Sequence, residues 1–348
     1  MVSSIRNKCV TCRKLNRQLQ QQLMAQIPLH RLKPSPVFHN THIDLFGPFK
    51  VKGVVNKRSI GKAFGVIFTC GSSRAVYCDV SQDYSTDGFL QTLRRFTSIR
   101  GYPSEVWSDC GTQLVAADKE MREMVKDFDQ EKLRQFGAHE GLKWHFSPPD
   151  APWHNGCAES LIKYVKKALK IAIGEQTLSF PELQTVMFEA ANIVNERPIG
   201  VKNMNIDDGN YICPNNLILG RASSRVPSGP FSDNPSFRKR HLFVQKLVDA
   251  FWKVWLRDYF PCLMVRQKWH VQKRQVCKGD IVMVKNSNAI RGDWQIGQIE
   301  NIYHSNDQIC RKVDVRYKIP INKKCGLIRR AVQSIVVLLP IEENNCSS

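Results

Sequence analysis

The order of strand-like and helix-like segments constrains the fold of this chain more than any other feature. Near its start, short apolar or alternating segments follow one another with only turn residues between them, which predicts three antiparallel strands at 38–46, 63–70 and 74–80. Helical and strand patterns then alternate, with helices at 86–100, 114–128, 157–173 and 180–196 and strands at 104–108 and 142–146. This order predicts an α/β domain with a mixed five-stranded sheet flanked by helices.

Three acidic residues lie at or near the ends of these predicted strands or at the start of the helix that follows. Asp44 lies near the end of the first strand, Asp109 directly follows the fourth, and Glu159 lies in the first turn of the helix after the fifth. Functional groups gather at the carboxyl ends of strands in such sheets, so the three carboxylates are expected to converge. Converging carboxylates suit two Mg²⁺ ions held against a phosphodiester, which makes polynucleotidyl transfer the leading hypothesis.

A simpler interpretation exists for each acid taken alone. A single Asp or Glu is most often a solvated surface charge. Glu159 could also complement the positive end of its own helix, and that role is compatible with metal binding.

The net charge of +20 is distributed unevenly along the chain. Residues 1–40 carry +7, residues 41–237 carry +1, residues 238–330 carry +14, and the last eighteen residues carry −2. Cationic flanks around a nearly neutral central segment favour binding to a phosphate backbone. The plainer alternative is a generally basic protein.

The second half of the chain predicts a smaller module. A linker rich in Ser, Pro and Gly precedes a basic amphipathic helix at 237–259, and short strands at 281–285, 294–303, 311–318 and 334–339 suggest a small barrel. The helix aromatics Phe251, Trp252 and Trp255, and Trp269 beyond it, are expected to be core or interface residues rather than platforms for bases.

Several motifs, in order, resemble the integrase of BEL/Pao-type LTR retrotransposons, within the retroviral integrase superfamily. The resemblance implies a ribonuclease-H-like catalytic core, in which the first and fourth strands of the sheet are neighbours. They include His-Ile-Asp-Leu-Phe-Gly-Pro (42–48), Ser-Asp-Cys-Gly-Thr-Gln (108–113) and Ala-Pro-Trp-His-Asn-Gly-Cys-Ala-Glu (151–159). Asn-Glu-Arg-Pro (195–198), Pro-Asn-Asn-Leu-Ile-Leu-Gly-Arg (214–221) and Lys-Gly-Asp-Ile-Val (278–282) continue the series. The resemblance extends over nearly the whole chain.

The resemblance divides the chain into five parts. These are a remnant of an N-terminal zinc module with its linker (1–34), the catalytic core (35–221), a linker (222–236), a basic helical connector (237–275) and an SH3-like, DNA-binding β-barrel (276–340).

By the same resemblance, Asp44, Asp109 and Glu159 are the catalytic triad and the ligands of two Mg²⁺ or Mn²⁺ ions. The implied reaction trims the 3′ ends of cDNA and joins them to target DNA. The implied partners are double-stranded cDNA ends, target DNA and further copies of the chain in a homo-multimer. The implied location is the nucleus, with a cytoplasmic particle stage.

The candidate DNA-binding residues surround the triad and open the second half of the chain. Lys163 and Lys166 follow Glu159 by four and seven residues, and so share its helix face. Contact with the DNA end is the favoured interpretation, and a salt bridge between Glu159 and Lys163 is the alternative. The other candidates are Lys167, Lys170, Asn155, His154, Arg238, Lys239 and Arg240.

The zinc module is the main departure from the family. Cys9 and Cys12 resemble the second half of a His₂Cys₂ site, but no histidine precedes them, and a structural zinc ion needs four ligands. We therefore do not expect a Zn²⁺ site in this chain. The other cysteines, such as Cys70, Cys78, Cys110 and Cys157, show no ligand spacing and are expected to be reduced and buried.

Two other function classes remain open from the residues. One is a domesticated or fragmentary DNA-binding protein without turnover, and the other is a nuclease of the same fold that cuts without joining. No apolar run approaches the 18 residues of a membrane span, so we expect no membrane association.

Overall fold

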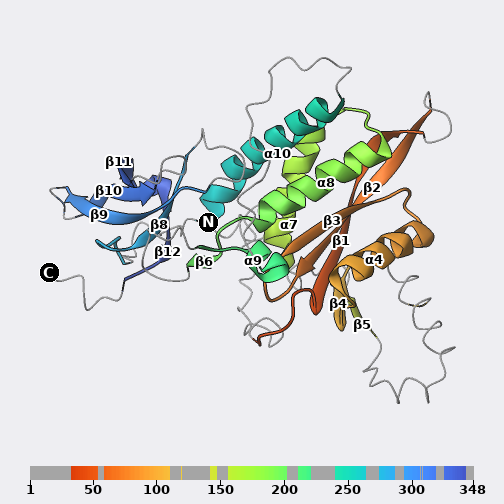
Figure 1. Ribbon diagram of the computed structural model, residues 1–348, viewed down its shortest axis with the longest axis horizontal. Helices are drawn as coiled ribbons and strands as arrows, with labels where there is room; N and C mark the ends of the chain where they lie inside the picture. Colours follow the sequence, from red (N-terminus) through yellow and green to blue (C-terminus); the bar gives the residue numbers. More distant parts are fainter. Residues whose placement is uncertain are drawn as a thin grey trace, which may run out of the picture. The chain divides into compact units, whose positions relative to one another are not determined.

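The computed structural model describes residues 33–53, 59–109, 119, 142–146, 156–201, 211–220, 240–263, 274–286, 294–305, 307, 309–318 and 325–341, with the backbone alone at 156–160. Its first sheet has five strands in the order β3-β2-β1-β4-β5 (Figure 1). β2 pairs antiparallel with β1 and β3, whereas β1, β4 and β5 run parallel. The predicted mixed sheet with adjacent first and fourth strands is confirmed. The strands are β1 (Asn40–Lys52), β2 (Ile60–Cys70), β3 (Val76–Ser81), β4 (Glu105–Ser108) and β5 (Lys143–Phe146).

Helices cover both faces of this sheet, because alternate residues of the central strands are apolar on each side. α4 (Thr86–Arg100) packs Phe89 and Phe96 against Phe68 on one face. α7 (Gly156–Ile173) and α8 (Phe180–Asn195) cover the other face, where Ile67 belongs to their core cluster. Figure 1 shows α4 on the opposite side of the sheet from α7 and α8.

The limits of α4 are those that its sequence predicts. Ser85 caps its first turn by accepting a hydrogen bond from the backbone N–H of Gly88 at 3.1 Å. Gly101 ends the helix with a φ of 88°, which a residue with a Cβ rarely adopts. The helix predicted at 114–128 lies outside the described residues.

α10 (Arg240–Leu263) adds a third helix to the α7 and α8 face. Phe251, Trp252 and Trp255 are buried in the same core cluster, which confirms the predicted core role of these aromatics. The Asp258 carboxylate of α10 pairs with Lys167 of α7 at 2.7 Å. Trp269 lies outside the described residues.

The second sheet is entirely antiparallel, in the order β11-β10-β9-β8-β12. Among the described residues no pairing joins the edge strands β11 and β12, so the closed SH3-like barrel stays a prediction. β11 has no counterpart among the predicted strands. The bounds are β8 (Ile281–Val284), β9 (Ile296–His304), β10 (Cys310–Lys318), β11 (Cys325–Ala331) and β12 (Ile335–Leu339), with a 3₁₀ turn at Val332–Ser334.

The Asn-Glu-Arg-Pro motif holds the end of α8 to the sheet. The Asn195 side chain accepts from the Val76 N–H at 2.8 Å and donates to the Val76 carbonyl at 2.7 Å. The buried Arg197 donates to the Arg74 carbonyl at 2.6 Å. Glu196 accepts from Asn215 at the start of the short helix α9 (Pro214–Leu219). This motif is therefore structural. A two-stranded ribbon, β6 (Gly200–Val201) and β7 (Tyr211–Ile212), lies between α8 and α9 in sequence.

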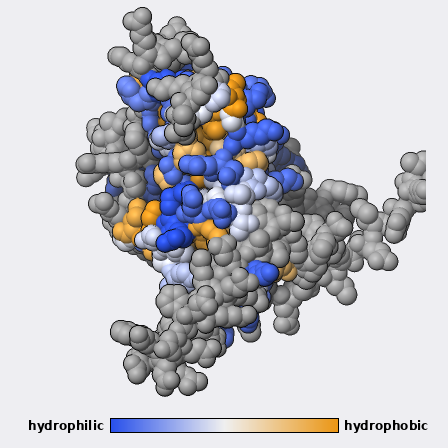
Figure 2. Space-filling view, turned by 90° about the vertical axis from the view of Figure 1, so that its right-hand side faces the viewer, coloured by the Kyte–Doolittle hydropathy of each residue, from blue (hydrophilic) through white to orange (hydrophobic). Residues whose placement is uncertain are grey.

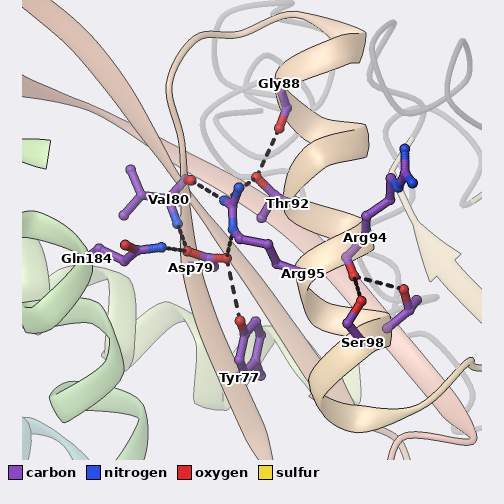
Figure 3. Close-up of polar contacts among 10 residues, drawn as sticks. Tyr77, Asp79, Val80, Gly88, Thr92, Arg94, Arg95, Ser98 and Gln184 are labelled. Atoms are coloured by element: carbon purple, nitrogen blue, oxygen red, sulfur yellow. Dashed lines mark hydrogen bonds and ion pairs between the residues drawn. The ribbon is translucent and has the colours of Figure 1, made fainter. Parts of the chain in front are cut away.

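A buried carboxylate fixes the outer strand β3 between two helices. Asp79 accepts from Arg95 of α4 at 2.7 Å and from Gln184 of α8 at 2.8 Å, and its own neighbour Val80 donates a backbone N–H (Figure 3). Tyr77 donates to the same carboxylate at 3.4 Å. A buried charge with this many donors is well satisfied, so we assign Asp79 a structural role.

One face of the described part of the chain is largely polar (Figure 2). Figure 2 shows one face on which hydrophilic residues predominate and hydrophobic residues form small separate patches. No helix in the described ranges is long and apolar enough to cross a bilayer.

Candidate active site

Asp44 lies on β1, and Asp109 directly follows β4, the parallel neighbour of β1. The register of β1 and β4 places His42 beside Trp107, and each carboxylate follows two residues later along its strand. Because side chains alternate along a strand, both aspartates belong to the sheet face that α7 covers. The charge of Asp109 raises the pKa of the Asp44 carboxyl, so the two groups are close enough to interact.

The surroundings of Asp44 make a full negative charge costly. Burial is the largest cause that raises its pKa above the ordinary value, and the charge of Asp109 adds to it. Lys166 of α7 opposes both effects through an ion pair and a hydrogen bond to the carboxylate. The net effect is still a raised pKa, because the loss of hydration on burial, with the charge of Asp109 added to it, outweighs the stabilisation that Lys166 gives to the carboxylate.

Lys166 is held in place by more than Asp44. Its ammonium also donates to the Leu45 carbonyl at 3.3 Å and lies 5.7 Å from the centre of the Phe46 ring. The apolar side of α7, including Val165 and Leu169, is buried, which fixes the rotation of the helix about its axis. Lys166 therefore reaches the site because of how the whole helix packs.

Glu159 belongs to the first turn of α7, and its side chain lies outside the described residues. Seven residues, or two helical turns, separate it from Lys166, so the two positions share a helix face about 10 Å apart along the axis. The structure thus brings Asp44, Asp109 and Lys166 together.

An aromatic row crosses the sheet directly before the two aspartates. His42 of β1 stacks on Trp107 of β4 with ring centres 5.2 Å apart, and Trp107 stacks on His145 of β5 at 4.9 Å. The strand registers align these three residues. His145 also lies 3.2 Å from the Glu105 carboxylate. The row was missed from the sequence, although His42 and Trp107 each precede an aspartate by two residues.

The other predicted site residues fall into three groups. Lys163 and Lys170 are exposed on α7. Lys167 and Arg240 are engaged in ion pairs, the first with Asp258 and the second through two hydrogen bonds to Glu182 at 2.6 and 2.7 Å. The remaining candidates lie outside the described residues: His154, Asn155, Arg238, Lys239, Cys9 and Cys12.

The donor chemistry of the site fits hard divalent cations. Two carboxylates with interacting charges supply oxygen ligands of the kind that Mg²⁺ and Mn²⁺ prefer. Within the described ranges no group of three His, Cys, Asp or Glu residues is close enough to hold a metal, and a third ligand would have to come from outside them. Of the predicted buried cysteines, Cys70 and Cys78 are buried, whereas the side chains of Cys110 and Cys157 lie outside the description.

The C-terminal part of the chain matches a known protein family. Residues 239–338 match a family described as of unknown function (DUF5641). This segment begins one residue before α10 and includes most of the second sheet. No curated protein matches the chain.

Similar solved structures come from retroviral integration complexes. One is the intasome of simian T-cell lymphotropic virus in complex with PP2A regulatory subunit B56 gamma, at 13% identity and a TM-score of 0.38, covering 97% of this chain and 90% of that chain. Another is the HTLV-2 integrase catalytic core domain in complex with magnesium (dimeric form), at 15% identity and a TM-score of 0.29, covering 46% and 88%. Both likenesses are distant, so the argument for function rests on the site itself.

Proposed function

We propose that the chain is an integrase of the BEL/Pao type, a metal-dependent polynucleotidyl transferase that trims the 3′ ends of cDNA and joins them to target DNA. One observation carries the proposal: Asp44 on β1 and Asp109 at the end of the adjacent parallel strand β4 are close enough for the charge of Asp109 to raise the pKa of Asp44. Such a pair, supplemented by Glu159 from α7, has the ligand chemistry that two Mg²⁺ or Mn²⁺ ions require.

Bound metal would activate the attacking hydroxyl and stabilise the leaving oxygen. The chain's own residues perform the remaining tasks. Asp44 and Asp109 supply the negative charge that holds the cations. Lys166 supplies positive charge beside Asp44, where a DNA phosphate must lie, and the exposed Lys163 extends that charge along α7. The stacked row of His42, Trp107 and His145 links β1, β4 and β5 just before the aspartates, and we propose that it helps to fix the strand ends that carry them.

The basic second half of the chain supports the same proposal. Residues 238–330 carry a net charge of +14, which suits non-specific attraction to target DNA. We propose that the second sheet is the DNA-binding module. Joining two cDNA ends in one event requires several copies of the chain, and we propose that this multimer works in the nucleus after a cytoplasmic particle stage.

A strand-transfer assay tests the proposal. The purified chain is mixed with labelled duplex ends, target DNA and Mg²⁺ or Mn²⁺, and is compared with Asp109→Asn. We expect joined products from the wild type only, while DNA affinity stays within about twofold in the variant because binding rests on the cationic flanks. Glu175→Gln is the matched control, since Glu175 is exposed and pairs with Lys50.

Two results would contradict the proposal. Nicking without joining would indicate a nuclease of the same fold. DNA binding with no chemistry under either metal would indicate a DNA-binding protein without turnover. A large loss of DNA affinity in Asp109→Asn would instead overturn the division of work between the core and the basic flanks.

A further inference from the structure

A pocket of about 250 Å³ lies at the outer edge of the first sheet, away from the aspartates. It is bounded by β3, the end of α4, α8 and α9. Two strand spacings, about 10 Å, separate β3 from β1, so the pocket is distinct from the candidate active site. Its principal lining residues are Tyr77, Ile99, Arg100, Phe188, Asn192 and Leu219.

Arg100 brings a positive charge into this pocket, and no described carboxylate forms an ion pair with it. Its guanidinium lies 5.7 Å from the centre of the Tyr77 ring, and its buried Nε has no hydrogen-bond partner among the residues that the structure describes. Burial lowers the pKa of Arg100, which shows that the folded chain penalises the charge. Arg95, five residues earlier on α4, is by contrast fully engaged with Asp79, Val80 and Thr92.

A carboxylate that entered the pocket would pair with the guanidinium, since a guanidinium and a carboxylate form two parallel hydrogen bonds. The pocket thus has an electrostatic reason to take an anion.

The rim of the pocket restricts the kind of anion. Ile99, Phe188 and Leu219 are exposed by 58%, 39% and 50%, although they are large apolar residues that line one cavity. A phosphate or a nucleic-acid backbone would leave these surfaces in water. A peptide with an acidic side chain beside a large apolar one would pair with the charge and cover the rim.

We propose that this pocket binds an acidic–apolar peptide segment of a protein partner, with a carboxylate on Arg100 and a neighbouring apolar side chain against Ile99, Phe188 and Leu219. The inference does not depend on the chemistry at Asp44 and Asp109.

Selection from a phage-displayed library of random peptides against the intact chain provides the test. We expect enriched peptides with Asp or Glu next to Leu, Ile or Phe. Measured by fluorescence anisotropy, their affinity should fall at least about tenfold with Arg100→Gln, and similarly when the peptide's own acid becomes an amide.

Two variants make the result specific. Arg94→Gln removes the same charge from an exposed position on the same helix and should change the affinity less than about twofold. Phe188→Ser keeps Arg100 but removes part of the apolar rim, and it should weaken binding while the chain stays folded and strand transfer is unchanged.

Three outcomes would overturn the proposal. The first is that no acidic–apolar sequence is enriched. The second is that enriched peptides bind Arg100→Gln and Arg94→Gln equally, which would mean diffuse electrostatic attraction. The third is that Phe188→Ser changes the oligomeric state in light scattering while peptides do not compete, which would mean that a second copy of the chain covers this surface.

Discussion

At the scale of single residues, the candidate site places charges where folding disfavours them. Asp44 has a raised pKa even though Lys166 pairs with it, because burial and the charge of Asp109 outweigh the ammonium. A carboxylate in such a buried environment is better explained by a role in ligand binding than by a contribution to the stability of the fold. The position of Lys166 could not be predicted, because the ion pair joins residues separated by 122 positions in sequence.

Asp44→Asn should therefore stabilise the protein while it abolishes strand transfer. A raised carboxyl pKa means that the folded chain retains this proton more tightly than the unfolded chain, so stability falls as pH rises from about 4 through the raised value. We expect the variant to gain about 1 kcal/mol at about pH 7 without divalent ions, a small figure because the Asp44 side chain is 32% exposed.

The gain should vanish near pH 4, where the native carboxyl is also protonated. Urea denaturation at both pH values measures it. Asp87→Asn is the control, since Asp87 lies exposed in the first turn of α4, where a negative charge is favourable. A loss of stability in Asp44→Asn at neutral pH would show that the Lys166 pair outweighs burial.

At the scale of elements, the sequence predicted well those features that depend on neighbouring residues in the chain. α4 has the predicted limits because Ser85 and Gly101 signal its ends, and the central strands are found because their apolar residues cluster. β11 was missed because Cys325–Ala331 contains two arginines and only two large apolar residues. The first sheet was predicted from its element order, but the structural role of Asn195 depends on a contact 119 residues away.

Asn195→Ala tests that contact. The change leaves the buried N–H and carbonyl of Val76 without partners on the edge strand β3. We expect a loss of about 2 to 3 kcal/mol in the free energy of unfolding, measured with urea. Thr185→Ala, an exposed change on the same helix, should cost less than about 0.5 kcal/mol. Equal effects of the two changes would refute a special role for Asn195.

The pair of Glu182 and Arg240 joins α8 to α10 and has a distinct pH signature. The hydrogen bonds of Arg240 lower the pKa of Glu182 from 4.5 to about 2. A lowered carboxyl pKa contributes stability above the ordinary value, and this stability disappears as pH falls from about 4.5 to about 2.

Arg240→Gln should accordingly cost about 1 kcal/mol at neutral pH and little near pH 2 to 3. Because the side chain is already engaged, its removal should weaken DNA binding less than Lys163→Gln does. Filter binding measures the DNA affinity of both variants. A larger loss of affinity in Arg240→Gln than in Lys163→Gln would show that Arg240 contacts DNA.

At the scale of the whole molecule, charge is divided between a nearly neutral core segment and a strongly basic second half. On β10, Lys312 and Arg316 alternate with the buried Val313 and Val315, so they lie on the outward face of the second sheet. This face could not be assigned from composition alone, because it depends on which residues the sheet buries.

The double change Lys312→Gln and Arg316→Gln should reduce DNA affinity and its salt dependence together. The slope of log association constant against log salt concentration should become less steep by about 2, one unit for each DNA phosphate that the protein no longer neutralises. Lys62→Gln with Arg94→Gln removes the same charge from exposed positions on β2 and α4 and should leave the slope nearly unchanged. Equal slopes for both double variants would show that the charge acts diffusely.

α10 belongs to the C-terminal family segment by sequence and to the helical core of the first half by packing. By sequence it opens the matched family segment 239–338, yet Phe251 and Trp255 are buried in the cluster that also contains residues of α7 and α8. Trp252 meanwhile contacts Trp294, just before β9, with ring centres 5.2 Å apart. A gene rearrangement that cut the chain just before α10 would expose the core residues of α7 and α8 that α10 covers. It would also leave the C-terminal part with a helix whose aromatic side chains face water. The two halves are therefore expected to have been inherited together. The matched family segment begins before α10, whereas by packing α10 belongs with the helices of the first half.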